Sequence, residues 1–83
     1  MFKSILRLPA VMAQTGLGRS TIYSQISEGL WPKPVNLGAR AFGWPSTEVD
    51  ALISARMAGR TNDQLQDLVV RLEAARRPDH EVV

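Results

Sequence analysis

The sequence predicts a small, mostly α-helical domain with one β-hairpin and an additional helix at its C-terminal end. Three observations support this fold class. Two helical segments separated by a glycine occupy residues 8–28, two short apolar segments flank a tight turn at residues 35–44, and a further helical pattern follows directly. These are the elements of a winged helix-turn-helix, which we predict for residues 1–59. Residues 60–83 are predicted to form an amphipathic helix and a frayed tail.

The first helix is expected over residues 8–14, after a short extended arm or strand at residues 1–7. Pro9 suits the first helical position, where its missing N–H is not needed for a hydrogen bond. Gly16 is expected to end the helix, and the apolar side chain of Leu17 can then fill the space between this helix and the next. Such a break between two short helices is typical of a helix-turn-helix.

The second helix is expected over residues 19–28, with Gly18 or Ser20 as its N-cap and Gly29 in the left-handed conformation after its end. On a helical wheel one face is apolar, and the opposite face carries small polar side chains. A helix with this pattern is half buried and half exposed, like the helix that enters the DNA major groove in this motif. Its inward positions are Ile22 and Ile26.

The exposed face of the second helix carries side chains that we predict to contact DNA. Serine and threonine hydroxyls can bond to base edges, whereas arginine and tyrosine can bond to phosphates. The alternative is that this face is only solvated. The predicted base contacts are Ser20, Thr21 and Ser24, and the predicted phosphate contacts on this helix are Arg19 and Tyr23.

The hairpin is expected directly after this helix, because Trp31-Pro32-Lys33-Pro34 cannot continue it. Two short strands, 35–37 and 41–44, surround a turn with Arg40 at or near its tip. Lys33 and Arg40 are predicted to contact phosphates, and Arg40 could also reach the minor groove. The alternative for Arg40 is a surface salt bridge. The aromatic side chains expected to pack the hairpin onto the helices are Trp31, Phe42 and Trp44.

The third helix is expected to start with Ser46 as its N-cap and to end at Gly59. Glu48 and Asp50 suit the positive end of the helix dipole. Because they are two residues apart, they point to different faces and do not form a catalytic pair of carboxylates. The expected buried stripe is Val49, Leu52, Ile53 and Met57.

The spacing of Thr61 and Gln64 is that of a capping box and predicts the start of the last helix. The helix is expected to end at about Arg77, because Pro78 cannot continue it. Its narrow apolar stripe permits two interpretations. In one, the stripe folds back onto the domain. In the other, it pairs with another chain and makes a homodimer or a cooperative oligomer. The stripe consists of Leu65, Leu68, Val69 and Leu72.

Composition and charge narrow the range of functions. The chain has no cysteine and no recognisable catalytic, metal-binding or phosphate-loop motif, and its single histidine, His80, lies in the expected tail. We therefore expect no enzymatic activity, no metal and no cofactor. Residues 1–45 carry a net charge of 5 − 1 = +4 and residues 46–83 carry 5 − 7 = −2. This asymmetry fits an anion-binding end and a solvated or partner-facing end.

Residues spread over positions 5–57 also carry a resemblance to a known family. They are Arg7-Leu8-Pro9, Val11, Thr15-Gly16-Leu17, Arg19-Ser20-Thr21-Ile22-Tyr23, Ile26, Gly29, Pro32-Lys33-Pro34-Val35, Leu37-Gly38, Arg40-Ala41, Gly43-Trp44 and Glu48-Val49-Asp50. In this order and spacing they resemble the AlpA family of small phage and mobile-element regulators. That family is related to excisionases and to the winged helix-turn-helix head of the MerR class.

The resemblance implies a sequence-specific protein that binds double-stranded DNA and belongs to a prophage or integrative element. Such a protein acts as a transcriptional regulator, as an excisionase that assists an integrase, or as both. The alternative function is a protein-interaction adaptor that uses the winged fold and the last helix to bind another regulator. Because no secretory signal or membrane span is evident, we expect a cytoplasmic, nucleoid-associated bacterial protein.

The resemblance also assigns residues to DNA. Those matching the helix that the family uses on DNA are Arg19, Ser20, Thr21 and Tyr23, and those matching its wing region are Lys33 and Arg40. The chain departs from the family at three places: the family usually has serine at the position of Gly18, and it often has a basic residue at the position of Ser24 and near Leu30. Since fewer charges face the phosphates, the binding of one monomer should be modest, which favours cooperative or dimeric binding.

Overall fold

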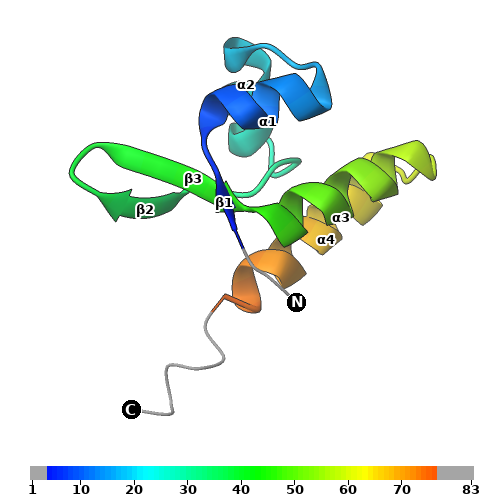
Figure 1. The fold of residues 1–83 in the computed structure, drawn as a ribbon. Helices are drawn as coiled ribbons and strands as arrows, with labels where there is room; N and C mark the ends of the chain where they lie inside the picture. The colour runs from blue at the N-terminus through cyan, green and yellow to red at the C-terminus, as the bar shows by residue number, and fades with distance from the viewer. Residues whose placement is uncertain (1–3, 77–83) are drawn as a thin grey trace.

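The computed structural model describes residues 4–76 and confirms the predicted fold class. It is mostly helical, with a small antiparallel sheet and a C-terminal helix. The elements are β1 (Ile5–Leu6), α1 (Leu8–Thr15), α2 (Arg19–Ser27), β2 (Val35–Gly38), β3 (Ala41–Pro45), α3 (Ser46–Met57) and α4 (Asn62–Ala74). In Figure 1, α1 and α2 lie together on one side of the sheet, the β2–β3 hairpin projects outward, and α3 and α4 run alongside each other.

The three strands pair in the order β1-β3-β2, and both pairs are antiparallel. The arm expected at residues 1–7 therefore contains a strand, in which Leu6 pairs with Trp44. Gly43 permits this close pairing. A Cβ added at Gly43 would collide with the side chain of Ile5 and would lie 2.9 Å from the carbonyl oxygen of Leu6. The absence of a side chain at this position thus lets β1 lie against β3.

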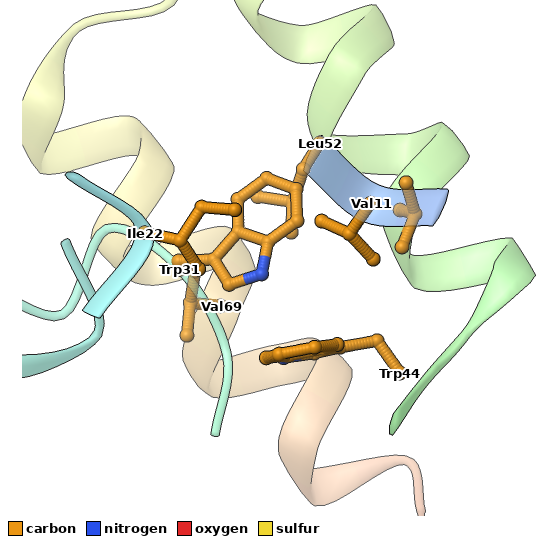
Figure 2. Packing of buried hydrophobic residues seen from close by; sticks show 7 residues of the cluster. Val11, Ile22, Trp31, Trp44, Leu52 and Val69 are labelled. Atoms are coloured by element: carbon orange, nitrogen blue, oxygen red, sulfur yellow. The ribbon is translucent and has the colours of Figure 1, made fainter. Parts of the chain in front are cut away.

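The core is built around two tryptophans that flank the first strand of the hairpin. Trp31 precedes β2 and Trp44 lies in β3, and each is 1% exposed. Figure 2 shows the Trp31 ring among apolar side chains from all four helices, with the Trp44 ring nearby. The indole Nε1 of Trp44 donates a hydrogen bond of 2.8 Å to the carbonyl oxygen of Pro32, which satisfies its buried polar atom. The other buried members of this cluster are Val11, Ile22, Val49, Leu52 and Val69.

The apolar stripe of the last helix packs against its own chain. Leu65 and Val69 are buried, and Leu68 and Leu72 pack against the core cluster. In the described residues the stripe thus folds back onto the domain, as in the first of its two interpretations, and pairing as a homodimer or cooperative oligomer stays a prediction. Helix α4 packs against α3 in this arrangement.

Several helix ends follow the local signals in the sequence. Gly18 is the N-cap of α2, and Gly29 follows its end with a φ of +78°. At the start of α4, the Gln64 N–H donates to the Thr61 hydroxyl at 3.2 Å, and the Thr61 N–H donates to the Gln64 side chain at 3.0 Å. This is the predicted capping box. The helix ends at Ala74, earlier than the sequence pattern predicts.

Two apolar side chains do not pack as expected. Phe42 is 47% exposed, because it lies further along the hairpin than Trp44, toward the turn and away from the helices. Met57 is 83% exposed. Met57 is the last residue of α3, one turn beyond Ile53, which packs against the core cluster, so its side chain lies past the end of the core.

The start of α3 also differs from the expectation. Ser46 is the first residue of the helix, and the N-cap is Pro45, which provides no side-chain hydrogen bond. The N–H of Ser46 instead donates to the carbonyl oxygen of Ser4 at 2.7 Å. The backbone just before β1 therefore satisfies a helix donor that a capping side chain would otherwise satisfy.

Replacing Val69 by alanine should lower the free energy of unfolding of the whole domain by about 2 kcal/mol, because a cavity opens in the shared core. Val70 is adjacent in sequence but 63% exposed, so it provides a matched control. Val70→Ala should change that free energy by less than about 0.5 kcal/mol. Urea unfolding followed by tryptophan fluorescence measures both variants. An unchanged tryptophan transition in Val69→Ala would indicate that residues 60–83 unfold as a separate unit.

Candidate nucleic-acid interface

The turn between α1 and α2 is held by local hydrogen bonds. Gly16 has a φ of +75°, which favours glycine, and its N–H donates to the carbonyl oxygen of Met12 at 2.8 Å. The Thr15 hydroxyl donates to the carbonyl oxygen of Val11 at 2.8 Å and accepts from the N–H of Leu17 at 3.2 Å. Leu17 then packs against the core, as its position in the sequence suggests. The direction in which α2 leaves α1 is therefore fixed.

The second helix has one buried and one exposed face. Ile22 is completely buried, and Ile26 packs against the core cluster. The hydroxyl of Ser27 donates to the carbonyl oxygen of Ser24 at 2.7 Å and is thus engaged within the helix. All five residues predicted from the sequence to contact DNA on this helix are exposed: Arg19, Ser20, Thr21, Tyr23 and Ser24.

The N-terminal end of α2 is open to a ligand. Its N-cap, Gly18, has no side chain that could accept from the N–H groups of the first turn, and that turn contains no acidic residue. The helix dipole therefore leaves a partial positive charge at this end, next to the exposed side chain of Arg19. These groups together favour an anion such as a phosphate.

The other two predicted contact residues lie outside α2. Lys33 is exposed on the connection between α2 and β2. Arg40 is exposed in the hairpin turn, where its φ of +59° is unusual for a residue other than glycine. The side-chain oxygen of Asn36 accepts from the N–H of Gly38 at 2.9 Å near this turn. Figure 1 shows the hairpin projecting from the helical part, so the predicted residues occupy a helix face, a connection and a hairpin tip.

Arg56 of α3 anchors the end of α2. Its Nη2 donates to the side-chain oxygen of Gln25 at 2.6 Å and to the carbonyl oxygen of Leu30 at 3.1 Å. Its guanidinium carbon also lies 5.8 Å from the centroid of the Trp31 ring, within cation–π range. Burial lowers the pKa of Arg56. The contacts with Gln25, Leu30 and Trp31 offset part of the cost of removing this charge from water.

Three side chains of the α4 region bind backbone atoms around the connection between α2 and β2. The Nε2 of Gln66 donates to the carbonyl oxygen of Glu28 at 2.9 Å. A carboxylate oxygen of Glu73 accepts from the N–H of Lys33 at 2.8 Å, and Nη2 of Arg76 donates to the carbonyl oxygen of Lys33 at 2.9 Å. Both backbone groups of Lys33 are therefore held by α4 and the turn that follows it, while the Lys33 side chain is exposed to solvent.

Arg76 also links the end of α4 to the start of α3. It donates to both carboxylate oxygens of Glu48, with distances of 2.6 and 2.8 Å. The hydrogen bond with Glu48 raises the pKa of the Arg76 guanidinium. Glu48 is 5% exposed, and this bidentate partner compensates for its burial. The sequence relates Glu48 only to the helix dipole and does not predict this pair.

Residues 4–57 match the family described as the prophage CP4-57 regulatory protein (AlpA). The chain belongs to the AlpA family. The matched residues include every element from β1 to α3 and therefore the complete helix-turn-helix and hairpin. Helix α4 lies outside the matched residues.

Two relatives are similar to this AlpA-family protein. "Uncharacterized protein ORF88" of Enterobacteria phage P4 is 47% identical over 55 residues, which cover 66% of this chain and 62% of the phage protein. The "DNA-binding transcriptional activator AlpA" of Escherichia coli (strain K12) is 40% identical over 58 residues, which cover 63% of this chain and 83% of the relative. The match thus spans less than two thirds of the phage protein. No solved structure matches the chain.

The residues that position the interface are not evident from the sequence. Arg56 appears there only as one more charged residue of a helix. Gln66, Glu73 and Arg76 are separated by seven and three residues, a spacing that places them near one face of a helix. That spacing is the available signal. Their partners include backbone atoms of the connection between α2 and β2. Because backbone groups are the same for every residue, the sequence does not mark these atoms as hydrogen-bond partners.

Within residues 4–76, no group of three or more His, Cys, Asp or Glu side chains is arranged to hold a metal ion. No helix in that part of this AlpA-family protein is long and apolar enough to cross a membrane. His80, which the sequence places in an expected frayed tail, lies outside the described residues.

Replacing Arg56 by methionine should lower the free energy of unfolding by about 1–3 kcal/mol, because the partners on Gln25 and Leu30 lose a charged donor. Arg60→Met is the control, since Arg60 is exposed and should tolerate the change within about 0.5 kcal/mol. Urea unfolding measures both values. Equal effects of the two substitutions would contradict the anchoring role of Arg56.

Proposed function

We propose that this AlpA-family protein is a sequence-specific DNA-binding regulator of a prophage or integrative element. The observation that carries the proposal is the exposed face of α2, which presents short polar side chains on a helix held by a helix-turn-helix. The name of the E. coli relative, a DNA-binding transcriptional activator, supports it. The similarity to a phage P4 protein supports the link to a mobile element.

In the proposed complex, the exposed face of α2 lies in the major groove. Ser20, Thr21 and Ser24 contact base edges there. A hydroxyl group can both donate and accept, so each contact gains its selectivity from the position at which the helix holds it. Because these side chains are short, the backbone of α2 can approach the bases closely.

The sugar-phosphate backbone binds to groups around this face. Arg19 contacts a phosphate together with the open N-terminus of α2, and Tyr23 bonds to a phosphate through its hydroxyl. Lys33 supplies a charge beyond the other end of the helix. Arg40, at the hairpin tip, contacts a neighbouring phosphate or enters the minor groove.

The regulator acts on DNA of the bacterial cytoplasm, associated with the nucleoid, in one of two ways. As a transcriptional regulator it binds upstream of a promoter. As an excisionase it binds an attachment site and assists an integrase. The adaptor function considered from the sequence is not favoured, because the apolar stripe that it requires on α4 is packed against the core.

A mobility-shift experiment with two fragments tests the proposal: the region upstream of the protein's own gene, and the attachment site of the element. Competitor DNA is included, and salt is about 50 or about 200 mM. Selective, salt-sensitive complexes are expected on at least one fragment. Upstream binding points to transcription, and attachment-site binding points to excision. Absence of selective binding on both, followed by absence of selection from a random DNA pool, would overturn the proposal.

Replacing Arg40 by asparagine should weaken binding to all sequences to a similar extent. Asparagine tolerates the left-handed backbone of this position, so the turn is kept while one positive charge is lost. The slope of log affinity against log salt should fall by about one unit. Arg60→Asn, at the α3–α4 connection far from the hairpin in Figure 1, is the control and should leave the slope unchanged. An unchanged slope in Arg40→Asn removes Arg40 from the contacts.

Replacing Ser24 by alanine should change sequence preference rather than general affinity. The loss of one base-edge hydroxyl should reduce discrimination at one base pair by about fivefold, close to 1 kcal/mol. Selection from a random DNA pool, followed by sequencing, measures this preference. Ser27→Ala is the matched control on the same helix, because the Ser27 hydroxyl is engaged with the Ser24 carbonyl oxygen. If both variants select the wild-type sequence, the proposed orientation of α2 is wrong.

A further inference from the structure

We propose that α4 is a positioning element for DNA reading, in which Glu73, with Gln66 and Arg76, fixes the spacing between α2 and the hairpin. This inference rests on the proposed function. It assigns a role in specificity to residues that do not themselves contact DNA. It also assigns that role to a helix beyond residues 4–57, the segment that matches the AlpA family.

The contacts converge on a short stretch of backbone. Gln66 binds the carbonyl oxygen of Glu28, which follows the last residue of α2. Glu73 and Arg76 bind the N–H and the carbonyl oxygen of Lys33, two residues before β2. The side chains of one C-terminal segment therefore hold both ends of the connection, at Glu28 and at Lys33.

The connection needs such support because it has little regular structure of its own. It contains Gly29, with a φ of +78°, and two prolines. Trp31 and Pro32 anchor its middle in the core, but Lys33 is exposed. The peptide unit that contains the Lys33 N–H is held on its buried side, where the Pro32 carbonyl oxygen accepts from the Trp44 indole, and Glu73 holds its exposed side. Loss of the Glu73 bond should therefore loosen this peptide, without releasing it, and broaden the range of directions in which the Lys33 side chain and the hairpin leave it.

The geometry matters for DNA because two elements must meet one duplex at the same time. If α2 lies in the major groove, Lys33 and the hairpin tip reach the neighbouring backbone only at one relative position. Loosening the connection leaves every contacting side chain in place but lowers the fraction of molecules in which all can bind together. Specific binding should therefore fall, whereas binding to random DNA, which tolerates many arrangements, should not.

Glu73 provides a clean pair of variants. Glu73→Ala removes the acceptor for the Lys33 N–H, whereas Glu73→Gln keeps an amide oxygen that can accept the same hydrogen bond. Both variants lose the same negative charge, so any general electrostatic gain toward DNA is equal in the two. The difference between them isolates the hydrogen bond. Because the bond lies at the surface, neither substitution should unfold the domain.

The test uses the full chain and two DNA probes, a duplex selected by the wild-type protein from a random pool and a duplex of random sequence. In Glu73→Ala, the ratio of the two affinities should fall by about three- to tenfold, the range that one hydrogen bond supplies. In Glu73→Gln it should stay within about twofold of wild type. Hydrogen exchange of the Lys33 amide, followed by NMR, should be faster in Glu73→Ala than in Glu73→Gln. Urea unfolding of both variants verifies that the core is intact.

The outcomes separate the inference from the function on which it rests. If the wild-type protein selects no DNA sequence, the proposed function fails, and the inference fails with it. If the wild type is selective but Glu73→Ala and Glu73→Gln give the same affinity ratio, the positioning role alone is overturned. The same conclusion follows if the ratio falls in Glu73→Ala while exchange of the Lys33 amide is unchanged.

Discussion

Trp31 and Trp44 insert into one core at the base of the hairpin, from the connection before β2 and from β3, and a hydrogen bond from the Trp44 indole to the Pro32 carbonyl oxygen joins these two segments. Each large ring buries more apolar surface than any aliphatic side chain could. In a chain of 83 residues without cysteine, the core has neither a disulfide nor thiolate metal ligation to stabilise it. The position of the hairpin and the end of α2 both depend on these two rings.

Polar contacts have a different role from this apolar core: they hold the backbone of the connection between α2 and β2. The long side chains of Arg56, on α3, and Arg76, just after α4, each reach a backbone carbonyl oxygen distant in sequence. Each also has a side-chain partner, Gln25 for Arg56 and Glu48 for Arg76. Backbone groups in a connection lack the partners that a helix or sheet would provide. Supplying these partners from α3 and the C-terminal segment gives an irregular connection a defined shape. The apolar core fixes where the elements lie, and these contacts refine the direction in which the connection presents its side chains.

The sequence was informative where structure is decided locally. The Gly18 cap, the Thr61–Gln64 capping box, the glycine turns and the periodicity of Ile22 and Ile26 depend on residues within one or two turns, and the structure bears them out. The prediction failed where distant packing decides. Phe42 has an aromatic side chain like those of Trp31 and Trp44, and only its distance along the hairpin leaves it exposed. The exposure of Met57 likewise depends on how far along α3 the core extends, because this residue is the last of the helix.

The same distinction applies to the candidate site. The predicted contact residues on α2 are all exposed. The sequence predicts this because apolar residues four apart, Ile22 and Ile26, mark the buried face of a helix and leave the polar residues on the other face. By contrast, no pattern in the sequence relates Glu73 to the N–H of Lys33, forty residues earlier.

The hairpin turn has a consequence for laboratory evolution of this protein. Arg40 holds a left-handed backbone that costs a residue with a Cβ atom about 1 kcal/mol relative to glycine. Selection for thermal tolerance alone would therefore enrich glycine or asparagine at this position. If the tip is used on DNA, such a screen would enrich heat-resistant proteins that have lost part of their affinity. A library built to improve this fold should keep position 40 constant.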